Sequence, residues 1–174
     1  MPFLIALNSY VELDCSEFGL QESLEAVVKQ VMELSIERKV QISCDYPQEV
    51  SSMRLYGDNL RLQQILSETL LSSIRFTPAL RGLCVSFKVI ARIEAIGKRM
   101  KRVELEFRII HPAPGLPEDL VREMFQPLRK GTSREGLGLH ITQKLVKLME
   151  RGTLRYLRES EMSAFVILTE FPLI

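Results

Sequence analysis

Tryptophan is absent from the 174 residues, histidine occurs twice and cysteine three times. No apolar run approaches the roughly 18 residues that a membrane-spanning helix needs. Cys15, Cys44 and Cys84 are far apart and form no CxxC or Cys/His cluster, so a metal site is not expected. We expect three small buried side chains in a reducing compartment.

The charges nearly balance, with a formal net charge of +1. This balance gives no general argument for nucleic acid or an anionic membrane as a partner. Apolar residues make up 46% of the chain, which favours a folded domain over disorder, and the length suits one domain. We assign residues 10–174 to that domain. Residues 1–9 are apolar without a basic leader, and we interpret them as a tag or the stub of an upstream element.

Hydrophobic periodicity predicts both kinds of secondary structure along the chain. Strands are expected at 10–14, 40–44, 53–56, 83–93, 103–110, 153–157 and 164–171; helices at 20–34, from an N-cap at Asp58 to just before Pro78, from Pro117 to 125, and at 136–149, ending at a C-cap at Gly152. Residues 126–135 are expected to form a mobile loop. This order favours an α+β fold, a two-layer sandwich in which the helices cover one face of a mixed, mostly antiparallel sheet.

Four segments, in a fixed order, carry a resemblance to a known family. They are Gly57-Asp58-Asn59-Leu60-Arg61-Leu62-Gln63-Gln64-Ile65-Leu66 with Arg75-Phe76-Thr77-Pro78; Pro114-Gly115-Leu116-Pro117; Met124-Phe125-Gln126-Pro127; and Gly136-Leu137-Gly138-Leu139-His140-Ile141. They resemble the N, G1, F and G2 boxes of the ATP-binding domain of sensor histidine kinases. The resemblance implies the Bergerat ATP-binding fold.

Two further segments narrow the resemblance. Leu55-Tyr56-Gly57-Asp58 and Tyr156-Leu157-Arg158-Glu159-Ser160 are similar to the histidine-kinase-related domain at the C-terminal end of plant phytochromes. That resemblance implies a homodimeric red/far-red photoreceptor in the cytoplasm and nucleus, with light-signalling proteins as partners and neither nucleic acid nor membrane bound directly. The bilin chromophore would sit in a separate module outside this chain.

The N-box helix departs from the kinase pattern. The resemblance places Ser72 where kinases have the asparagine that holds Mg²⁺, and a hydroxyl is a shorter ligand. Glu68, one turn earlier, stands where related ATPases have a water-activating base, and a plain helix-surface carboxylate is the alternative. Arg75 is a further candidate for nucleotide contact on this helix.

The G1 box departs as well. Its adenine-binding aspartate is matched by His111, and Ala113 and Gly115 match its two glycines. A neutral histidine can accept one hydrogen bond but carries no fixed negative charge. The alternative is a structural histidine at the end of a strand.

The G2 box keeps Gly136 and Gly138 ahead of a helix, where backbone amides attract phosphate. Arg129, Lys130 and Arg134 in the preceding loop would add positive charge. An ordinary glycine turn beside a solvated basic loop is the alternative. Lys98 to Arg102 is interpreted as a solvated hairpin loop, with nuclear import as a second use.

These departures favour weak or absent binding of Mg·ATP. Each lost charge-assisted contact costs roughly 1.5–3 kcal/mol, so two lost contacts reduce affinity by roughly 10² to 10⁴ if their effects add. His111 and His140 are the only histidines, and neither lies in a phosphoacceptor pattern. A regulatory output module without histidine kinase activity is therefore the first hypothesis. Residual serine/threonine kinase or ATPase activity, and an unrelated α/β domain with chance motifs, are the alternatives.

Overall fold

A computed structural model describes residues 12–80 and 82–174. The assignment of residues 1–9, and the first part of the strand expected at 10–14, lie outside the described residues. Within them, residues 12–15 are not in a strand, and the first strand, β1, covers Ser16–Gly19 instead. No helix among the described residues is long and apolar enough to cross a membrane.

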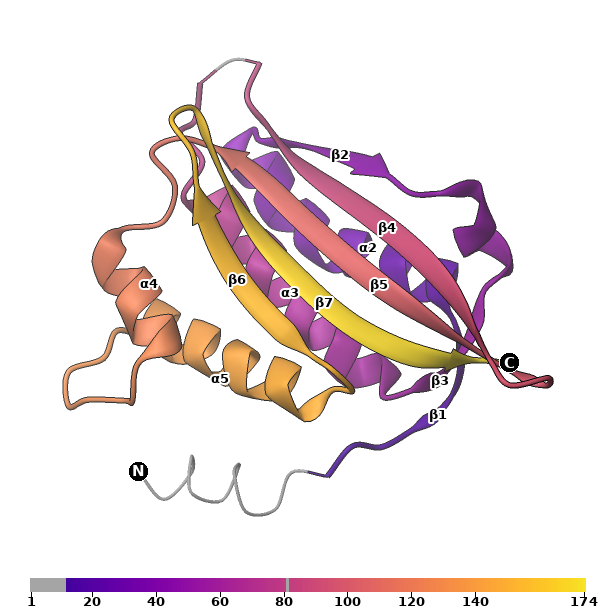
Figure 1. Ribbon diagram of the computed structural model, residues 1–174. Helices are drawn as coiled ribbons and strands as arrows, with labels where there is room; N and C mark the ends of the chain where they lie inside the picture. Colours follow the sequence, from indigo (N-terminus) through magenta and orange to yellow (C-terminus); the bar gives the residue numbers. More distant parts are fainter. Residues whose placement is uncertain (1–11, 81) are drawn as a thin grey trace.

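The strands form one mixed sheet of seven (Figure 1). They are β1 (Ser16–Gly19), β2 (Gln41–Asp45), β3 (Arg54–Gly57), β4 (Cys84–Ile96), β5 (Met100–Pro112), β6 (Thr153–Arg158) and β7 (Met162–Leu173). Their order is β1-β3-β7-β5-β4-β2, and β6 pairs with β7. Only the β2–β4 pair is parallel among the described strands. The prediction of a mixed, mostly antiparallel sheet is confirmed.

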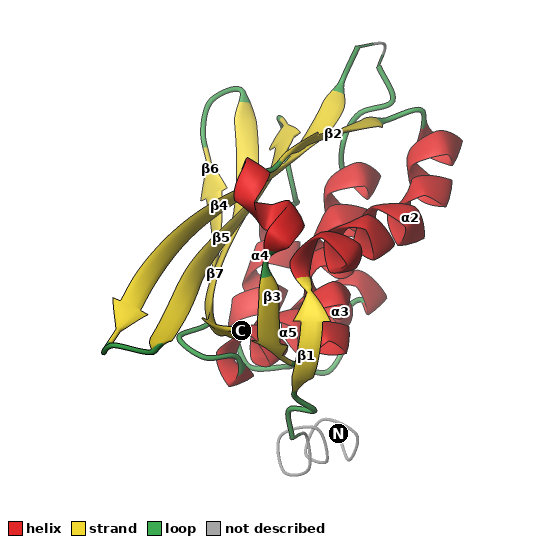
Figure 2. Cartoon of the chain, turned by 90° about the vertical axis from the view of Figure 1, so that its right-hand side faces the viewer, coloured by secondary structure: helices red, strands yellow, loops and turns green. Residues whose placement is uncertain are grey.

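The helices are α2 (Leu20–Arg38), α3 (Asn59–Arg75), α4 (Glu118–Phe125) and α5 (Arg134–Leu148), and a short 3₁₀ helix covers Gln48–Ser52. Figure 2 shows the helices gathered on one side of the sheet. The predicted α+β sandwich with helices on one face is therefore confirmed.

The core lies between the sheet and this helical layer. Val103, Leu105, Phe107 and Ile109 alternate along β5 and are fully buried, as a strand with one covered face requires. They meet the apolar stripe of α3, which includes Leu66 and Leu70. The same alternation continues to His111 and turns that side chain inward as well.

Helix ends confirm one expected cap and correct two boundaries. Asp58 caps α3, because its carboxylate accepts a hydrogen bond from the Arg61 N–H (3.0 Å). Helix α5 begins at Arg134 rather than Gly136, because the Ser133 hydroxyl caps it by accepting from the Gly136 N–H (3.0 Å). The loop before it is correspondingly shorter. The C-cap of α5 is Met149, not Gly152.

The expectation of buried cysteines is wrong. Cys15 and Cys44 are exposed and Cys84 is half-buried. Cys15 precedes β1, and Cys44 lies on β2, a strand at the edge of the sheet. An edge strand has one side without a neighbour, so side chains there are less covered.

The basic run at residues 98–102 is only partly a loop. Lys98 and Arg99 lie in the turn between β4 and β5, and β5 begins at Met100.

Candidate functional site

His111 lies at the end of β5, 1% exposed, with its ring stacked on Phe165 (centroids 6.1 Å apart). Its Nε2 is 3.0 Å from the Tyr156 hydroxyl. That hydroxyl oxygen accepts a hydrogen bond from the Leu116 N–H (2.8 Å), so its own hydrogen is free to be donated to Nε2. Nδ1 then carries the imidazole hydrogen, and it has no partner among the described residues.

Burial is the main reason why the pKa of His111 falls to about 4, and the nearby Arg158 guanidinium lowers it further. The ring is therefore neutral at physiological pH. Its acceptor nitrogen is already used by Tyr156, and the remaining nitrogen is a donor. His111 thus offers nothing like the carboxylate that accepts from the adenine amino group in the kinase pattern.

Gly115 follows in a loop that is held against the sheet. Its φ is +79°, and a Cβ built on it would lie 2.6 Å from both the Tyr156 hydroxyl and Ser163 Oγ. Arg158 donates hydrogen bonds to the carbonyl oxygens of Pro114 (3.0 Å) and Leu116. The loop is therefore packed onto β6 and β7 by contacts within the chain.

The α3 candidates lie along one side of that helix. Ser72 is fully buried, and its hydroxyl has no hydrogen-bond partner among the described residues. Glu68 is half-buried. Burial raises the pKa of its carboxyl, and the opposing effect of Arg75 is smaller. The two alternatives for Glu68, a base or a helix-surface carboxylate, both stay predictions.

The start of α5 contacts two carboxylates. A Cβ built on Gly138 would lie 2.7 Å from Glu68 Oε1, and one built on Gly136 would lie 1.7 Å from Glu123 Oε2. Glu123, on α4, also accepts hydrogen bonds from the hydroxyl (2.7 Å) and N–H (3.4 Å) of Ser133. Both G2-box glycines therefore provide close approach for acidic side chains of this chain.

Close contacts link some of the predicted residues in two groups. Glu68 meets Gly138 between α3 and α5, and His111 meets Gly115 through Tyr156. Arg134 is exposed in the first turn of α5. Of the residues predicted to contact nucleotide, only the loop cations Arg129 and Lys130 line the two cavities beside the loop at 126–133.

At the start of α5, Gly138 faces Glu68 and Gly136 faces Glu123, so a phosphate that approached these glycines would meet negative charge. The buried Ser72 hydroxyl has no hydrogen-bond partner among the described residues and is therefore available as a cation ligand. Among the described residues, no group of three His, Cys, Asp or Glu side chains is placed to hold a metal ion.

Sequence reasoning missed Glu123, Ser133 and the bonding role of Tyr156. Ser133 carried a usable signal, since a serine three residues before Gly136 fits a helix N-cap. Tyr156 stands out in the sequence only because its segment resembles the phytochrome domain. Nothing in the local sequence around Glu123 indicates that α4 packs its carboxylate against another helix.

A family model places these features in a known class. Residues 57–173 match the histidine kinase-, DNA gyrase B- and HSP90-like ATPases, and the chain belongs to this family. The catalytic domain of histidine kinase ThkA shares the fold with a TM-score of 0.63 at 20% identity, covering 93% of this chain and 97% of that one.

Plant photoreceptors are more similar in sequence. Phytochrome C of Oryza sativa subsp. indica is 52% identical over 163 residues, which are 94% of this chain and 14% of that protein. Phytochrome 2 of Ceratodon purpureus is 43% identical over 166 residues, 95% of this chain and 14% of that protein. The chain thus spans about a seventh of the length of these relatives. Its family and its similarity to phytochromes agree with the resemblance found in the motifs.

Proposed function

We propose that this chain is a regulatory output module of a red/far-red photoreceptor, with a histidine-kinase-like ATPase fold and no histidine kinase activity. The similarity to phytochromes along nearly the whole chain supports the photoreceptor context. In that context the protein would be a homodimer of the cytoplasm and nucleus, its bilin held by a module outside this chain. Its partners would be light-signalling proteins, with neither nucleic acid nor membrane bound directly.

The observation that carries the loss of kinase activity is the pair of carboxylates at the start of α5. Glu68 and Glu123 face Gly138 and Gly136. A bound triphosphate would have to displace or neutralise both, and like charges close together are costly in a partly buried site. The neutral, hydrogen-bonded His111 and the hydroxyl of Ser72 add to this argument, because neither replaces the acidic or amide group of an active kinase.

Calorimetric titration with Mg·ATP tests the proposal, with Mg·ADP as the control nucleotide. We expect no saturable heat up to millimolar nucleotide. Micromolar binding of Mg·ATP would contradict it, since the carboxylates would then have to move aside at little cost.

Residual serine/threonine kinase or ATPase activity is the second candidate, and Glu68 favours it. A carboxyl with a raised pKa beside a glycine turn is a reasonable general base. In a longer chain with measurable phosphotransfer, Glu68→Ala and Gly138→Ala would reduce the rate if this site were responsible. Unchanged activity in both variants would exclude the site.

A further inference from the structure

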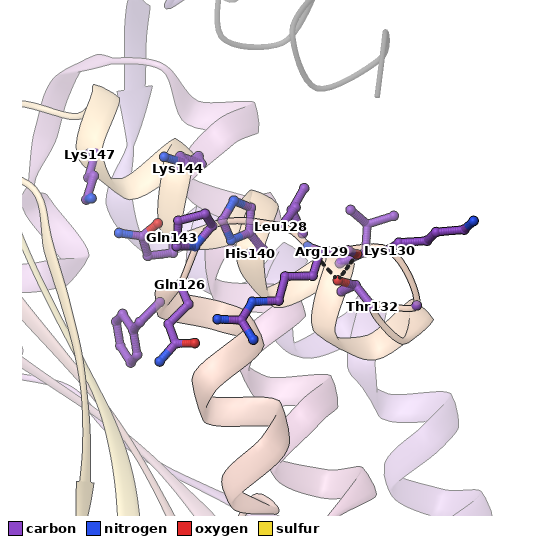
Figure 3. Close-up of a pocket in the computed structure, with 13 residues that line it drawn as sticks. Gln126, Leu128, Arg129, Lys130, Thr132, His140, Gln143, Lys144 and Lys147 are labelled. Carbon is purple, nitrogen blue, oxygen red and sulfur yellow. Dashed lines mark hydrogen bonds between the residues drawn. The ribbon is translucent and has the colours of Figure 1, made fainter.

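Helix α5 borders a cavity on the side away from Glu68. A cavity of about 770 Å³ opens between the loop after α4 and α5, within the size range of ligand pockets. Residues 125–132 form one wall, and Leu137, His140, Gln143, Lys144 and Lys147 of α5 form the other (Figure 3). We call it the loop–α5 pocket.

The pocket residues of α5 and Gly138 lie on different sides of the helix. Gly138 points toward Glu68. Since successive helix residues are about 100° apart, Lys147 lies about 180° and Lys144 about 240° around the axis from Gly138. The pocket residues of α5 therefore lie on the opposite side of the helix from Gly138 and Glu68, whereas Gly136, about 160° from Gly138, lies on the same side as the pocket.

The pocket is positively charged. Arg129, Lys130, Lys144 and Lys147 line it, and no lining residue is acidic. None of the four forms an ion pair with another described residue. Residues 126–149 contain five Lys or Arg and only one acid, Glu135, in a chain whose net charge is +1. The charge is thus concentrated here and is not a property of the whole chain.

The positive groups are spread along the pocket. Lys147 and Lys130 lie at opposite ends of the view in Figure 3. A single phosphate or carboxylate could contact only one end. An extended ligand with several negative groups matches the distribution better.

Apolar and amide groups complete the lining. Phe125, 40% exposed, and Leu128 belong to the loop wall, and Leu137 to α5. Gln143, 6% exposed, contributes an amide group to the α5 wall. The Thr132 hydroxyl donates to the Arg129 carbonyl (2.7 Å) and holds the tip of the loop in a turn. A ligand here needs an apolar anchor as well as negative charge.

We propose that the loop–α5 pocket docks an acidic segment of a partner protein, with carboxylates flanking an apolar anchor. Lys144 and Lys147 on α5, and Arg129 and Lys130 on the loop, contact the carboxylates. Leu128 and Leu137 receive the anchor. The inference rests on the proposed output function only in that such a module needs a surface for partners. The nucleotide titration and the peptide titration use different ligands, so the two can fail separately.

Fluorescence anisotropy with a labelled peptide tests the proposal on the full chain. The probe is a short peptide in which Glu and Asp flank a Leu-Phe pair. Lys144→Glu with Lys147→Glu should weaken its binding at least about tenfold. The matched control, Lys98→Glu with Arg99→Glu, makes the same charge change in the exposed β4–β5 turn and should weaken it less than about twofold.

A second peptide, with Ser-Ser in place of Leu-Phe, tests the anchor and should bind at least about tenfold more weakly. Amide chemical shifts of the unmodified protein during titration should change at residues 125–132 and along α5, which keeps the test decisive if a variant misfolds. Equal weakening by both double variants, equal binding of both peptides, tighter binding to anionic lipid vesicles, or no saturable binding would each overturn the proposal.

Discussion

Ser133 and Glu123 join the two helices that flank the loop–α5 pocket. The Ser133 hydroxyl donates to the Glu123 carboxylate (2.7 Å) and accepts from the Gly136 N–H (3.0 Å). One hydroxyl therefore caps α5 and ties it to α4. The carbonyl oxygen of Glu123 also lies 3.2 Å from His140 Nδ1. Glu123 of α4 therefore contacts the α5 segment at both Ser133 and His140.

Replacing Glu123 by Gln should lower the free energy of unfolding by about 1 kcal/mol, because the charged acceptor at the start of α5 is lost. Urea unfolding followed by circular dichroism measures this. The control is Glu161→Gln, the same change at an exposed side chain in the β6–β7 turn, which should stay within about 0.5 kcal/mol of the parent. Equal effects from both would show that the Glu123 bonds contribute little.

Replacing Tyr156 by Phe should cost about 1–3 kcal/mol, since the Leu116 N–H and His111 Nε2 both lose their partner while the ring packing on Phe165 remains. Thermal and urea unfolding give the loss. Tyr56→Phe is the matched control, because Tyr56 is 49% exposed and should change little. A neutral result at Tyr156 would mean that water replaces the hydroxyl.

The sheet and the helical layer could be predicted from the sequence because they depend on local periodicity. The alternation along β5 and the apolar stripe of α3 record which side faces the core. The position of Glu123 could not be predicted in this way. Its role depends on how α4 packs against α5, which is a contact between elements that no local pattern encodes.

The start of α5 shows a similar limit. Two glycines normally indicate a loop, and the expected helix began at Gly136. The Ser133 cap lets the helix begin two residues earlier, at Arg134. Both glycines then lie inside the helix, where the absence of a Cβ allows the close approach of Glu123 and Glu68. The expected burial of Cys44 was wrong for a related reason, since composition does not reveal which strands lie at a sheet edge.

Protonation of His111 should destabilise the fold in acid. Its pKa falls from 6.5 to about 4 on burial, so the unfolded state binds more protons between these values and the free energy of unfolding falls as pH drops through them. The loss is up to about 3 kcal/mol and is complete below about pH 4. Urea unfolding across this range measures the slope.

The variant His111→Gln should remove this part of the slope. Glu68 acts in the opposite sense, because its raised pKa makes the native state bind more protons than the unfolded one near and above pH 4.5. The difference between the parent and His111→Gln isolates the histidine. A slope unchanged in His111→Gln would assign the acid sensitivity to other groups.

Gly115→Ala should be more destabilising than Gly97→Ala, although both glycines have positive φ, +79° and +70°. At Gly97 a Cβ would meet nothing within 4 Å, so the cost is backbone strain alone, about 1 kcal/mol. At Gly115 the methyl group would also collide with the Tyr156 hydroxyl and Ser163 Oγ, for a total of about 2–4 kcal/mol. Urea unfolding of the two variants compares them directly. Equal losses would show that the loop can move off β6 and β7 at little cost.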